Sequence, residues 1–515
     1  MSNQETTMAN LDPQIARSLR FSLCDGALAT MMVSLAGGVF LVGFAMNVLG
    51  ASTVQVGILA ALPLSANLAQ FLGSLILETL GRRRIVCILL ATLSRLCWIL
   101  IILLPLALFD GIGDARIWLL IVFVGFSSIL GSMSGVAWLE WTSDVVPPSI
   151  RGSFFGKRNM IAAGAGMVAV LAGGYFLNRW ELIRGPADPY GYMMLFGAGL
   201  LFGLLSSAAL TQIIDPRQPE TDTKQAFSWK RFAAPLQDAN FRRLVFYVGA
   251  FMFVTQMAGP FYAVYMIDTL SIDFSTITWF ITFATLASLF MLRIWGPIAD
   301  EFGNRPILIV AGLAHALIPL SWVVAQSGAY FGPIAVAHVL SGMFHAAIVL
   351  AHLNILIKLS PDRGRSIYIA VFNGMIGLAV AVAPIVGGWF LDLTQDVQFT
   401  AGNWQINHLH LLFLVSGGLQ IGVLFMLFSI HEEGAAPSRA VLLQLRNDLD
   451  PQTGIAGVSD LVSVKAARTG NLLRLWDSRT DAWVARSEAR IARSLDRIEN
   501  KWRVFSKTKR FLREI

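Results

Sequence analysis

Charged residues are scarce in this chain of 515 residues, since Asp, Glu, Lys and Arg together make up only 14%. Ordinary soluble domains carry about 25% charged residues, so this composition excludes an ordinary soluble protein. Hydrophobic residues make up 55%, the mean hydropathy is +0.63, and the apolar residues fall in runs long enough to span a bilayer. The sequence therefore predicts a polytopic membrane protein.

Cysteine is also rare, and Cys24, Cys87 and Cys97 all lie in or beside predicted membrane spans. This placement argues against a disulfide framework and against a metal cluster. No nucleophile with a base, no metal-ligand set and no phosphate-binding loop emerges, so we expect neither an enzyme nor a bound cofactor or metal. The first twenty residues lack the pattern of a cleaved signal peptide, which favours a retained first helix.

Long apolar runs dominate the remaining sequence, and each is about 18 to 29 residues long. Lipid offers no partner for unpaired backbone groups, and the runs do not alternate as barrel strands do, so helices are expected. The twelve predicted spans are 21–49, 54–77, 85–109, 117–141, 154–177, 192–214, 244–267, 277–298, 307–324, 331–357, 367–391 and 409–430.

Segments of the first half recur in the second half at a nearly constant spacing. Ser74–Arg84 and Gly296–Arg305 align acid on acid and glycine on glycine, 222 positions apart. A second pair begins at Gly38 and Gly259, 221 positions apart. The chain therefore consists of two similar halves.

Loop charge predicts the orientation, because Lys and Arg concentrate after the second, fourth, sixth and tenth spans. Under the positive-inside rule both termini and the long middle loop are cytoplasmic. The net charge of +7 then reflects topology and anionic lipid rather than nucleic acid. The expected parts are a cytoplasmic N-terminal tail (1–20), a six-helix half (21–214), a cytoplasmic linker (215–240), a second six-helix half (241–430) and a cytoplasmic tail (431–515).

The segment Gly296-x-x-x-Asp300-x-x-Gly303-x-Arg305 after the eighth span resembles the cytoplasmic loop signature of the major facilitator superfamily. The resemblance, of a bacterial type, implies an all-α fold of twelve transmembrane helices in two pseudo-symmetric six-helix halves. It also implies a multi-pass protein of the bacterial inner (plasma) membrane, working by symport or antiport of a small-molecule solute. The halves would rock around a central site near the bilayer midplane.

The same resemblance assigns the cytoplasmic gate to the two copies of the loop, and the gate residues are Glu78, Gly81, Arg82, Gly296, Asp300, Gly303 and Arg305. The first copy departs from the pattern, since Ser74 replaces the opening glycine and Glu78 replaces the aspartate. Two glycines around an acid and a base allow a tight turn between helices. The alternative is that these loops are only topological anchors.

Polar residues inside the spans are candidates for function because ionisable groups are costly at membrane depth. They are Asp25, Arg95, Glu140, Gln256, Arg293, His315, His338, His345, His352 and Asn373. In the resembling family the first, fourth, seventh and tenth helices line the central cavity. The expected cavity and proton-coupling residues on those helices are Asp25, Glu140, Gln256, Tyr262, Tyr265, His338, His345 and His352.

His338, His345 and His352 are spaced by sevens, so they fall on one helix stripe at depths about 10.5 Å apart. They cannot jointly bind one metal ion, and His345, nearest the middle, suits a proton carrier. Neutral histidines hydrogen-bonded between helices are the alternative. A buried Glu140 beside tryptophans would also suit a proton carrier, whereas a solvated interfacial anchor is the alternative. Asp25 fits a coupling role or an interfacial one equally well.

Substrate signals are weak. The fourth helix lacks the arginine that drug–proton antiporters of this family place early in it, which lowers the case for that class. Gln256-x-x-Gly259-x-x-Tyr262-x-x-Tyr265 faintly resembles the sugar porters, although kinked aromatic helices are common in transporters.

The tail carries a second set of predictions. From about Asp481 onward it has the pattern of an amphipathic helix, suited to an anionic inner leaflet, with a coiled coil as the competing interpretation. Residues 432–457 read as a flexible link. Two functions therefore stay open. The first is a transporter of a small organic solute coupled to protons, and the second is a membrane scaffold that binds a protein partner through the tail.

Overall fold

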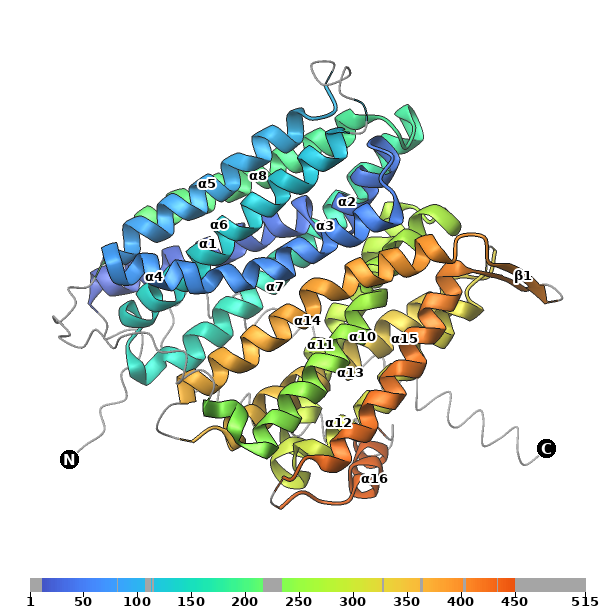
Figure 1. Ribbon diagram of the computed structural model, residues 1–515. Helices are drawn as coiled ribbons and strands as arrows, with labels where there is room; N and C mark the ends of the chain where they lie inside the picture. Colours follow the sequence, from blue (N-terminus) through green and yellow to red (C-terminus); the bar gives the residue numbers. More distant parts are fainter. Residues whose placement is uncertain are drawn as a thin grey trace, which may run out of the picture. The chain divides into compact units, whose positions relative to one another are not determined.

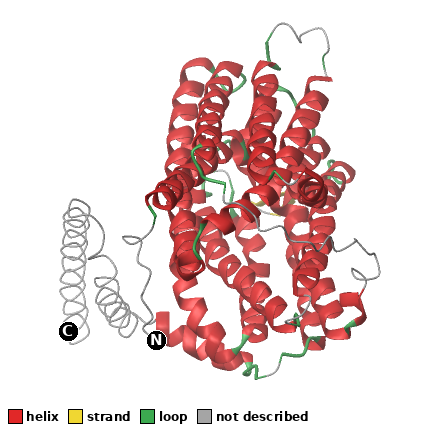
Figure 2. Cartoon of the chain, turned by 90° about the vertical axis from the view of Figure 1, so that its left-hand side faces the viewer, coloured by secondary structure: helices red, strands yellow, loops and turns green. Residues whose placement is uncertain are grey.

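The computed structural model describes residues 12–80, 82–106, 113, 115–215, 234–326, 328–361, 365–401, 404–432 and 434–449. Helices make up nearly all of them (Figure 2). Residues Arg17–Leu445 form one compact unit, which contains the membrane spans considered below except for the first four residues of the first span. Of the second unit, residues 1–16 and 446–515, the described parts are mainly the ends of two helices.

The first half contains six crossings (Figure 1). Two of them are interrupted. The first crossing runs through α1 (Pro13–Ala36), α2 (Gly38–Gly43) and the π-helical η2 (Phe44–Val48), and the second through α3 (Thr53–Ser65), η3 (Ala66–Ala69) and α4 (Gln70–Leu80). The others are α5 (Arg83–Leu103), α6 (Ala115–Val145), α7 (Arg151–Arg184), preceded by η5 (Pro148–Ile150), and α8 (Pro189–Thr211).

The second half repeats the pattern after η6 (Ala234–Gln237). Its crossings are α10 (Ala239–Val264) with η7 (Tyr265–Thr269), α11 (Phe274–Phe302), α12 (Asn304–Val324), α13 (Phe331–Leu359), α14 (Arg365–Leu393) and α15 (His408–Leu424) with η8 (Phe425–Ser429). A short hairpin of β1 (Gln398–Ala401) and β2 (Trp404–Asn407) joins α14 to α15. Among the described residues, eleven helical crossings are long and apolar enough to span a membrane, and the divided crossing 53–80 adds the twelfth.

The two halves share an irregularity as well as a plan. The π-helical turn Phe44–Val48 ends the first crossing, and Tyr265–Thr269 ends the seventh at a spacing of 221 positions. The spacing equals that of the Gly38 and Gly259 sequence repeat. A rare local structure at matched positions supports duplication of one six-helix unit.

The halves meet closely at one end, which we call the far end: the end at which α3 and α11 begin and α7 ends. There α3 packs along α14, and α7 packs along α11. A Cβ atom on Gly388 would lie 2.8 Å from the Thr53 carbonyl oxygen, and one on Gly174 would lie 2.7 Å from that of Phe274. These glycines allow the helix backbones to approach each other as membrane helices commonly do.

A hydrophobic core lies behind these contacts. One buried cluster contains residues of both halves, such as Phe40 and Phe274, whose rings stack with centroids 5.9 Å apart. A second buried cluster contains only residues between Phe241 and Leu445, near the end at which α11 and α13 end. We call this other end the basic end because it carries the turns at Arg82, Arg151 and Arg305. The shared core therefore closes the far end.

The chain after the last crossing is held against the second half, which corrects the expected flexible link over 432–445. The Ala436 backbone N–H donates to the Phe302 carbonyl at 2.9 Å. Beyond it, α16 (Ser438–Leu449) buries Val441 and Leu445 in the second cluster. The predicted amphipathic helix after Asp481 lies outside the described residues.

Docking of α16 can be tested by placing a charge on its buried face. Val441 is fully buried, whereas the neighbouring Leu442 is 54% exposed. An unpaired carboxylate is strongly unfavourable in an apolar core, so Val441→Asp should release α16. We expect tryptic cleavage at Arg439 to become about tenfold faster, because cleavage follows the population of the opened state. Leu442→Asp is the matched control and should leave the rate unchanged; equal rates in the two variants would contradict docking.

Candidate functional site

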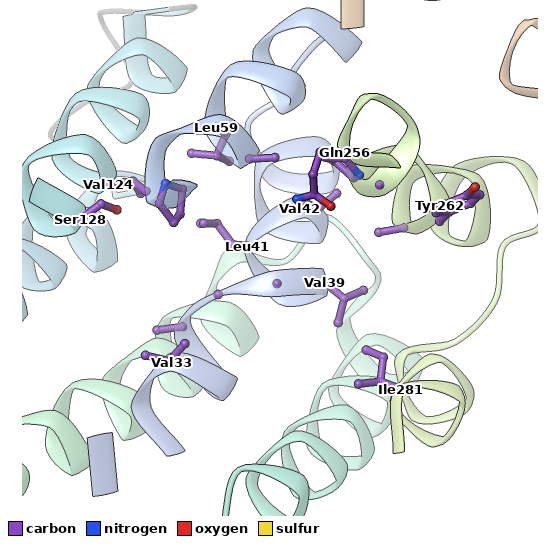
Figure 3. A pocket seen from close by; sticks show the side chains of 18 of the residues that line it. Val33, Val39, Leu41, Val42, Leu59, Val124, Ser128, Gln256, Tyr262 and Ile281 are labelled. Atoms are coloured by element: carbon purple, nitrogen blue, oxygen red, sulfur yellow. The ribbon is translucent and has the colours of Figure 1, made fainter. Parts of the chain in front are cut away.

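A central cavity of about 920 Å³ lies between the two halves (Figure 3). The first half lines it from α1, α2, α3, α5 and α6, and the second half from α10, α11, α12, α13 and α15. The first crossing breaks at the cavity, where α1 ends at Ala36 and Gly38 takes a φ of +53°. Glycine adopts this left-handed conformation readily and other residues rarely do, so the glycine at position 38 permits the break in the helix.

The two walls of the cavity differ in chemistry. The wall of the first half is mainly aliphatic, with Val33, Leu41 and Leu59 among its side chains. The wall of the second half carries most of the hydrogen-bonding groups, and Gln256 extends from α10 toward Val42 of α2 (Figure 3). Among the described lining residues, Arg95 is the only one with a permanently charged side chain.

Four of the predicted cavity residues line this space: Gln256, Tyr262, His338 and His345. His345 is exposed to it, whereas the Nδ1–H of His338 donates to the Ile334 carbonyl, 3.0 Å away. His315, on α12, lines the cavity beside them and contacts Gln420 of α15 through Nδ1 at 2.8 Å.

Two other predicted residues are held in the packed interior instead. His352 is buried beside the rings of Tyr247 and Phe251, so the helix drift over fourteen residues carries it off the cavity stripe. Tyr265 donates its hydroxyl to the Ala325 carbonyl at 2.6 Å and lies 2.7 Å from His410 Nε2. Tyr265 thereby joins the end of the seventh crossing to its neighbours rather than facing a solute.

Asp25 lies outside the cavity lining but is connected to it through a buried polar network. Its carboxylate pairs with Arg158 at 3.0 Å and accepts from the Ser206 hydroxyl at 2.6 Å. Arg95 donates to Ser206 at 2.8 Å and also to Ser207. The network joins α1, α5, α7 and α8 and reaches from the cavity wall at Arg95 to Arg158, whose guanidinium lies over the Trp138 ring.

Glu140 lies at the basic end and not in the cavity. Its side chain is 49% exposed and forms a 3.6 Å ion pair with the buried Arg83, which also pairs with Asp144 at 2.6 Å. The expectation that Glu140 is a buried carboxylate beside tryptophans is therefore wrong. Glu140 is half-exposed and pairs with Arg83 at the turn between α4 and α5. Tryptophans near the end of a span are typical interfacial residues, which explains why the sequence misleads here.

At the equivalent turn of the second half, between α11 and α12, a single carboxylate gathers several donors. Glu432 accepts from the backbone N–H of Asn304 at 2.9 Å, from that of Arg305 at 2.6 Å and from the Asn304 side chain at 2.9 Å. Lys358 Nζ lies 2.7 Å from the same carboxylate. Gly303 precedes α12 and has no side chain to cap it, so Glu432 satisfies the free N–H groups from 128 residues away.

Electrostatics at this turn favour the ionised form of Glu432. Burial by itself would raise the pKa of Glu432, but the hydrogen bonds from Lys358, Arg305 and Asn304 together hold that pKa below its usual range. The partial positive charge of the α12 N-terminus acts in the same direction. Glu432 therefore stays a carboxylate at neutral pH and fastens the segment after η8 to the turn.

The predicted gate residues gather at these two turns but differ in their contacts. Gly303 has a φ of +86° at the turn, and Asp300 is exposed. The guanidinium carbon of Arg305 lies 6.0 Å from the centroid of the Phe428 ring. Gly296 lies within α11, and Arg82 is exposed just before α5. Gly81 and the Glu78 side chain lie outside the described residues.

Sequence reasoning missed several residues that carry these sites, above all Arg83, Arg158, Ser206, Gln420 and Glu432. Ser206 and Gln420 are polar residues inside apolar runs, which is a signal that could have found them. The pairings of Arg83 and Glu432 depend on helix packing, and nothing local in the sequence indicates them.

Comparison with known proteins agrees with this architecture. A family model described as Major Facilitator Superfamily matches residues 26–256 and again residues 244–485. The chain is 31% identical over 113 residues to the efflux pump dotC of Dothistroma septosporum, which is 22% of this chain and 19% of that protein. The match thus spans about a fifth of the length of that curated relative.

Two solved structures have a similar fold. The nucleoside transporter NupG superposes with a TM-score of 0.57 at 11% identity, over 81% of this chain and 99% of NupG. A D-xylose–proton symporter superposes with a TM-score of 0.59 at 14% identity, over 82% of this chain and 99% of the symporter.

Removal of the charge at Glu432 should loosen the turn between α11 and α12. We expect Glu432→Gln to lower the free energy of unfolding by about 1–3 kcal/mol at neutral pH, because donors to the carboxylate lose a charged partner. The stabilisation by an acid with a lowered pKa is present at neutral pH and is lost as pH falls through that pKa. The difference in Tm from the native protein should therefore shrink in acid. Glu301→Gln, at an exposed carboxylate of α11, is the control; a pH-independent difference would contradict the assignment.

Proposed function

This chain belongs to the major facilitator superfamily, and we propose that it is a secondary active transporter of a small organic solute that works by alternating access. The observation that carries the proposal is the cavity between the halves. Its volume of about 920 Å³ falls in the range of about 300–1,000 Å³ found for sites that enclose small molecules. It lies between two pseudo-symmetric halves, where rocking would expose it to either side in turn.

The closed far end supports a particular state of the cycle. The shared core and the glycine contacts join the halves there, and Asn178 Nδ2 donates across the interface to Asp273 Oδ1 at 3.0 Å. Under the positive-inside rule, Arg82, Arg151 and Arg305 support a cytoplasmic location for the opposite end. We assign the conformation to the inward-facing state, with both termini on the cytoplasmic side of the plasma membrane. The bacterial origin expected from the sequence stays a prediction, since the curated relatives are fungal.

Proton coupling is the second part of the proposal, and Asp25 is a better candidate than Glu140 for the carboxylate that carries the proton. Asp25 is 3% exposed and is linked to the cavity wall through Ser206 and Arg95. Protonation of this carboxylate would weaken its ion pair with Arg158 and so alter the packing of α1 against α7. The ion pair of Glu140 is instead with Arg83 at the basic end, and neither residue lines the cavity. His345 stands in the cavity itself and is proposed as a further proton-accepting group.

The scaffold alternative depends on the tail, most of which lies outside the described residues. The transport proposal has a described site of suitable size, so it is the one that the geometry favours.

A bulky side chain in the cavity should block transport without unfolding the protein. Ser128 lines the cavity on α6, and the neighbouring Ile129 is 39% exposed on the outer face of the same helix. We expect Ser128→Trp to abolish flux in proteoliposomes, measured with whichever solute most raises the Tm in a panel of sugars, nucleosides, organic acids, peptides and drugs. Ile129→Trp is the matched control and should transport normally. Undiminished flux through folded Ser128→Trp would contradict the cavity as the route.

Loss of the Asp25 carboxylate should separate coupling from exchange. We expect Asp25→Asn to abolish solute accumulation driven by a pH gradient and to preserve solute exchange across equal pH, because exchange needs no net proton movement. Glu140→Gln, which removes a half-exposed carboxylate at the basic end, should accumulate solute normally. Accumulation that survives in Asp25→Asn and fails in Glu140→Gln would return the coupling role to Glu140.

A further inference from the structure

We propose that Asp25 exchanges its proton with the cytoplasm through a narrow hydrated passage that leads from the basic end along α1. The passage runs past Ser22, and Trp138 and Thr142 of α6 hold its waters from the other side. The inference rests on the proposed proton coupling and identifies the route by which the buried carboxylate is reached.

Three polar side chains of this region are buried without a hydrogen-bond partner among the described residues. They are the Ser22 hydroxyl, the Trp138 indole N–H and the Thr142 hydroxyl. Ser22 and Thr142 are fully buried. A buried polar group that is left unpaired is costly, and bound water commonly satisfies such groups where several of them lie together. Three of them in one region therefore indicate bound water.

Arg158 brings two of these residues to the Asp25 carboxylate. Its Nε donates to the Ser22 carbonyl at 3.2 Å, and its Nη2 donates to Asp25 at 3.0 Å. The guanidinium carbon of Arg158 also lies 4.1 Å from the centroid of the Trp138 ring. Ser22 and Trp138 therefore both contact the side chain that pairs with Asp25.

The row of polar groups continues from Asp25 to the basic end. Ser18, Ser22 and Asp25 follow one another on α1 at steps of four and three residues, so they share one face over about 10.5 Å. Ser18 Oγ accepts from the Ile214 backbone N–H at 3.1 Å, and Trp141 Nε1 donates to the Ile214 carbonyl at 2.9 Å. The beginning of α1 and the end of α6 therefore meet around Ile214, and the unpaired hydroxyl of α6 belongs to the residue after Trp141.

Arg95 obstructs the alternative route from the cavity. It stands between the cavity and the Asp25 carboxylate, which it reaches through Ser206. A guanidinium does not give up its proton in a protein, so it cannot relay one, and its positive charge repels an approaching hydronium ion. A hydroxyl group, in contrast, both accepts and donates hydrogen bonds. Ser22 and Thr142 are thus suited to pass a proton on, whereas an indole N–H can only hold a water in place.

The transfer of the proton must also satisfy the charged and titratable groups around Asp25. They are Arg158 of α7, Arg95 and Cys87 of α5 and, on α6, Glu140 and Asp144, which pair with Arg83. A water of the passage donates its proton to the carboxylate as the hydrogen bond from Arg158 is released. That water takes a proton from the next hydroxyl or water in the row. One proton thus enters from the cytoplasm, and no charge is left in the passage.

Infrared difference spectra of the full-length protein in lipid nanodiscs test the passage without a solute. A caged compound releases protons in a light flash, and the carboxyl band of Asp25 is identified by its absence in Asp25→Asn. We expect the band to rise about tenfold more slowly in Ser22→Ala, which is a small part of the ~10²–10⁴-fold that positioned groups contribute to proton transfer. Ser34→Ala, on the same helix beyond Asp25, is the matched control and should respond as the native protein does.

A pair of substitutions at Thr142 separates the hydroxyl group from packing. Thr142→Val keeps the volume and removes the hydroxyl, whereas Thr142→Ser keeps the hydroxyl and loses a methyl group. We expect Thr142→Val to slow the band about tenfold, and Thr142→Ser to keep the native rate. Removal of an unpaired buried hydroxyl should not lower the Tm, so slow proton uptake in folded Thr142→Val would reflect proton transfer.

Two results would overturn the passage. Native rates in Ser22→Ala and Thr142→Val are the first, and a rate in Thr142→Ser as slow as that in Thr142→Val is the second. Either result would leave coupling through Asp25 standing, because the band still reports its protonation. A spectrum that is unchanged in Asp25→Asn would contradict both the passage and the proposed coupling role of that carboxylate.

Discussion

The low dielectric constant between membrane helices constrains this structure more than any other factor. A charged or polar group buried there finds no water, so its favourable partner must come from the protein. Arg83 meets Asp144 and Glu140 at one turn, and Glu432 meets Lys358 and the start of α12 at the equivalent turn. Each cluster joins elements that are distant in sequence. The positions of the helices at the basic end therefore depend on where these few charges are satisfied.

The two halves solve the same geometric problem with opposite charges. In the first half an arginine at the turn receives carboxylates from the end of α6, whereas in the second half Lys358 at the end of α13 meets a carboxylate that arrives from beyond η8. In the second half, the segment after Glu432 also packs on this end: Ala436 donates to the Phe302 carbonyl, and α16 buries Val441 and Leu445 in the second cluster. The two halves therefore share a backbone plan but differ in the ion pairs at the basic end. If that end moves, the start of the tail would move with the second half, because Glu432 joins the two.

The cavity is divided in a similar way. One half contributes a mainly aliphatic wall and a broken first helix, and the other contributes aromatic rings, histidines and glutamines. The close backbone contacts at the far end keep the two walls together, because glycines there leave no side chain between the helices. The proposed proton coupling through Asp25 would then act from the wall of the first half.

The sequence by itself determined the membrane class, the helical spans and the duplication, because hydropathy and repeat spacing are local properties that survive any packing. It also indicated Gln256, Tyr262, His338 and His345 as residues of helices that face the cavity, where the structure places them. Packing alone decided that His352 and Tyr265 lie in the interior, that Glu140 pairs with Arg83, and that Asp25 joins Arg95 through Ser206. The spacing of residues along one helix predicts that their side chains share a face only over a turn or two. Which neighbouring helix that face contacts depends on how the helices cross.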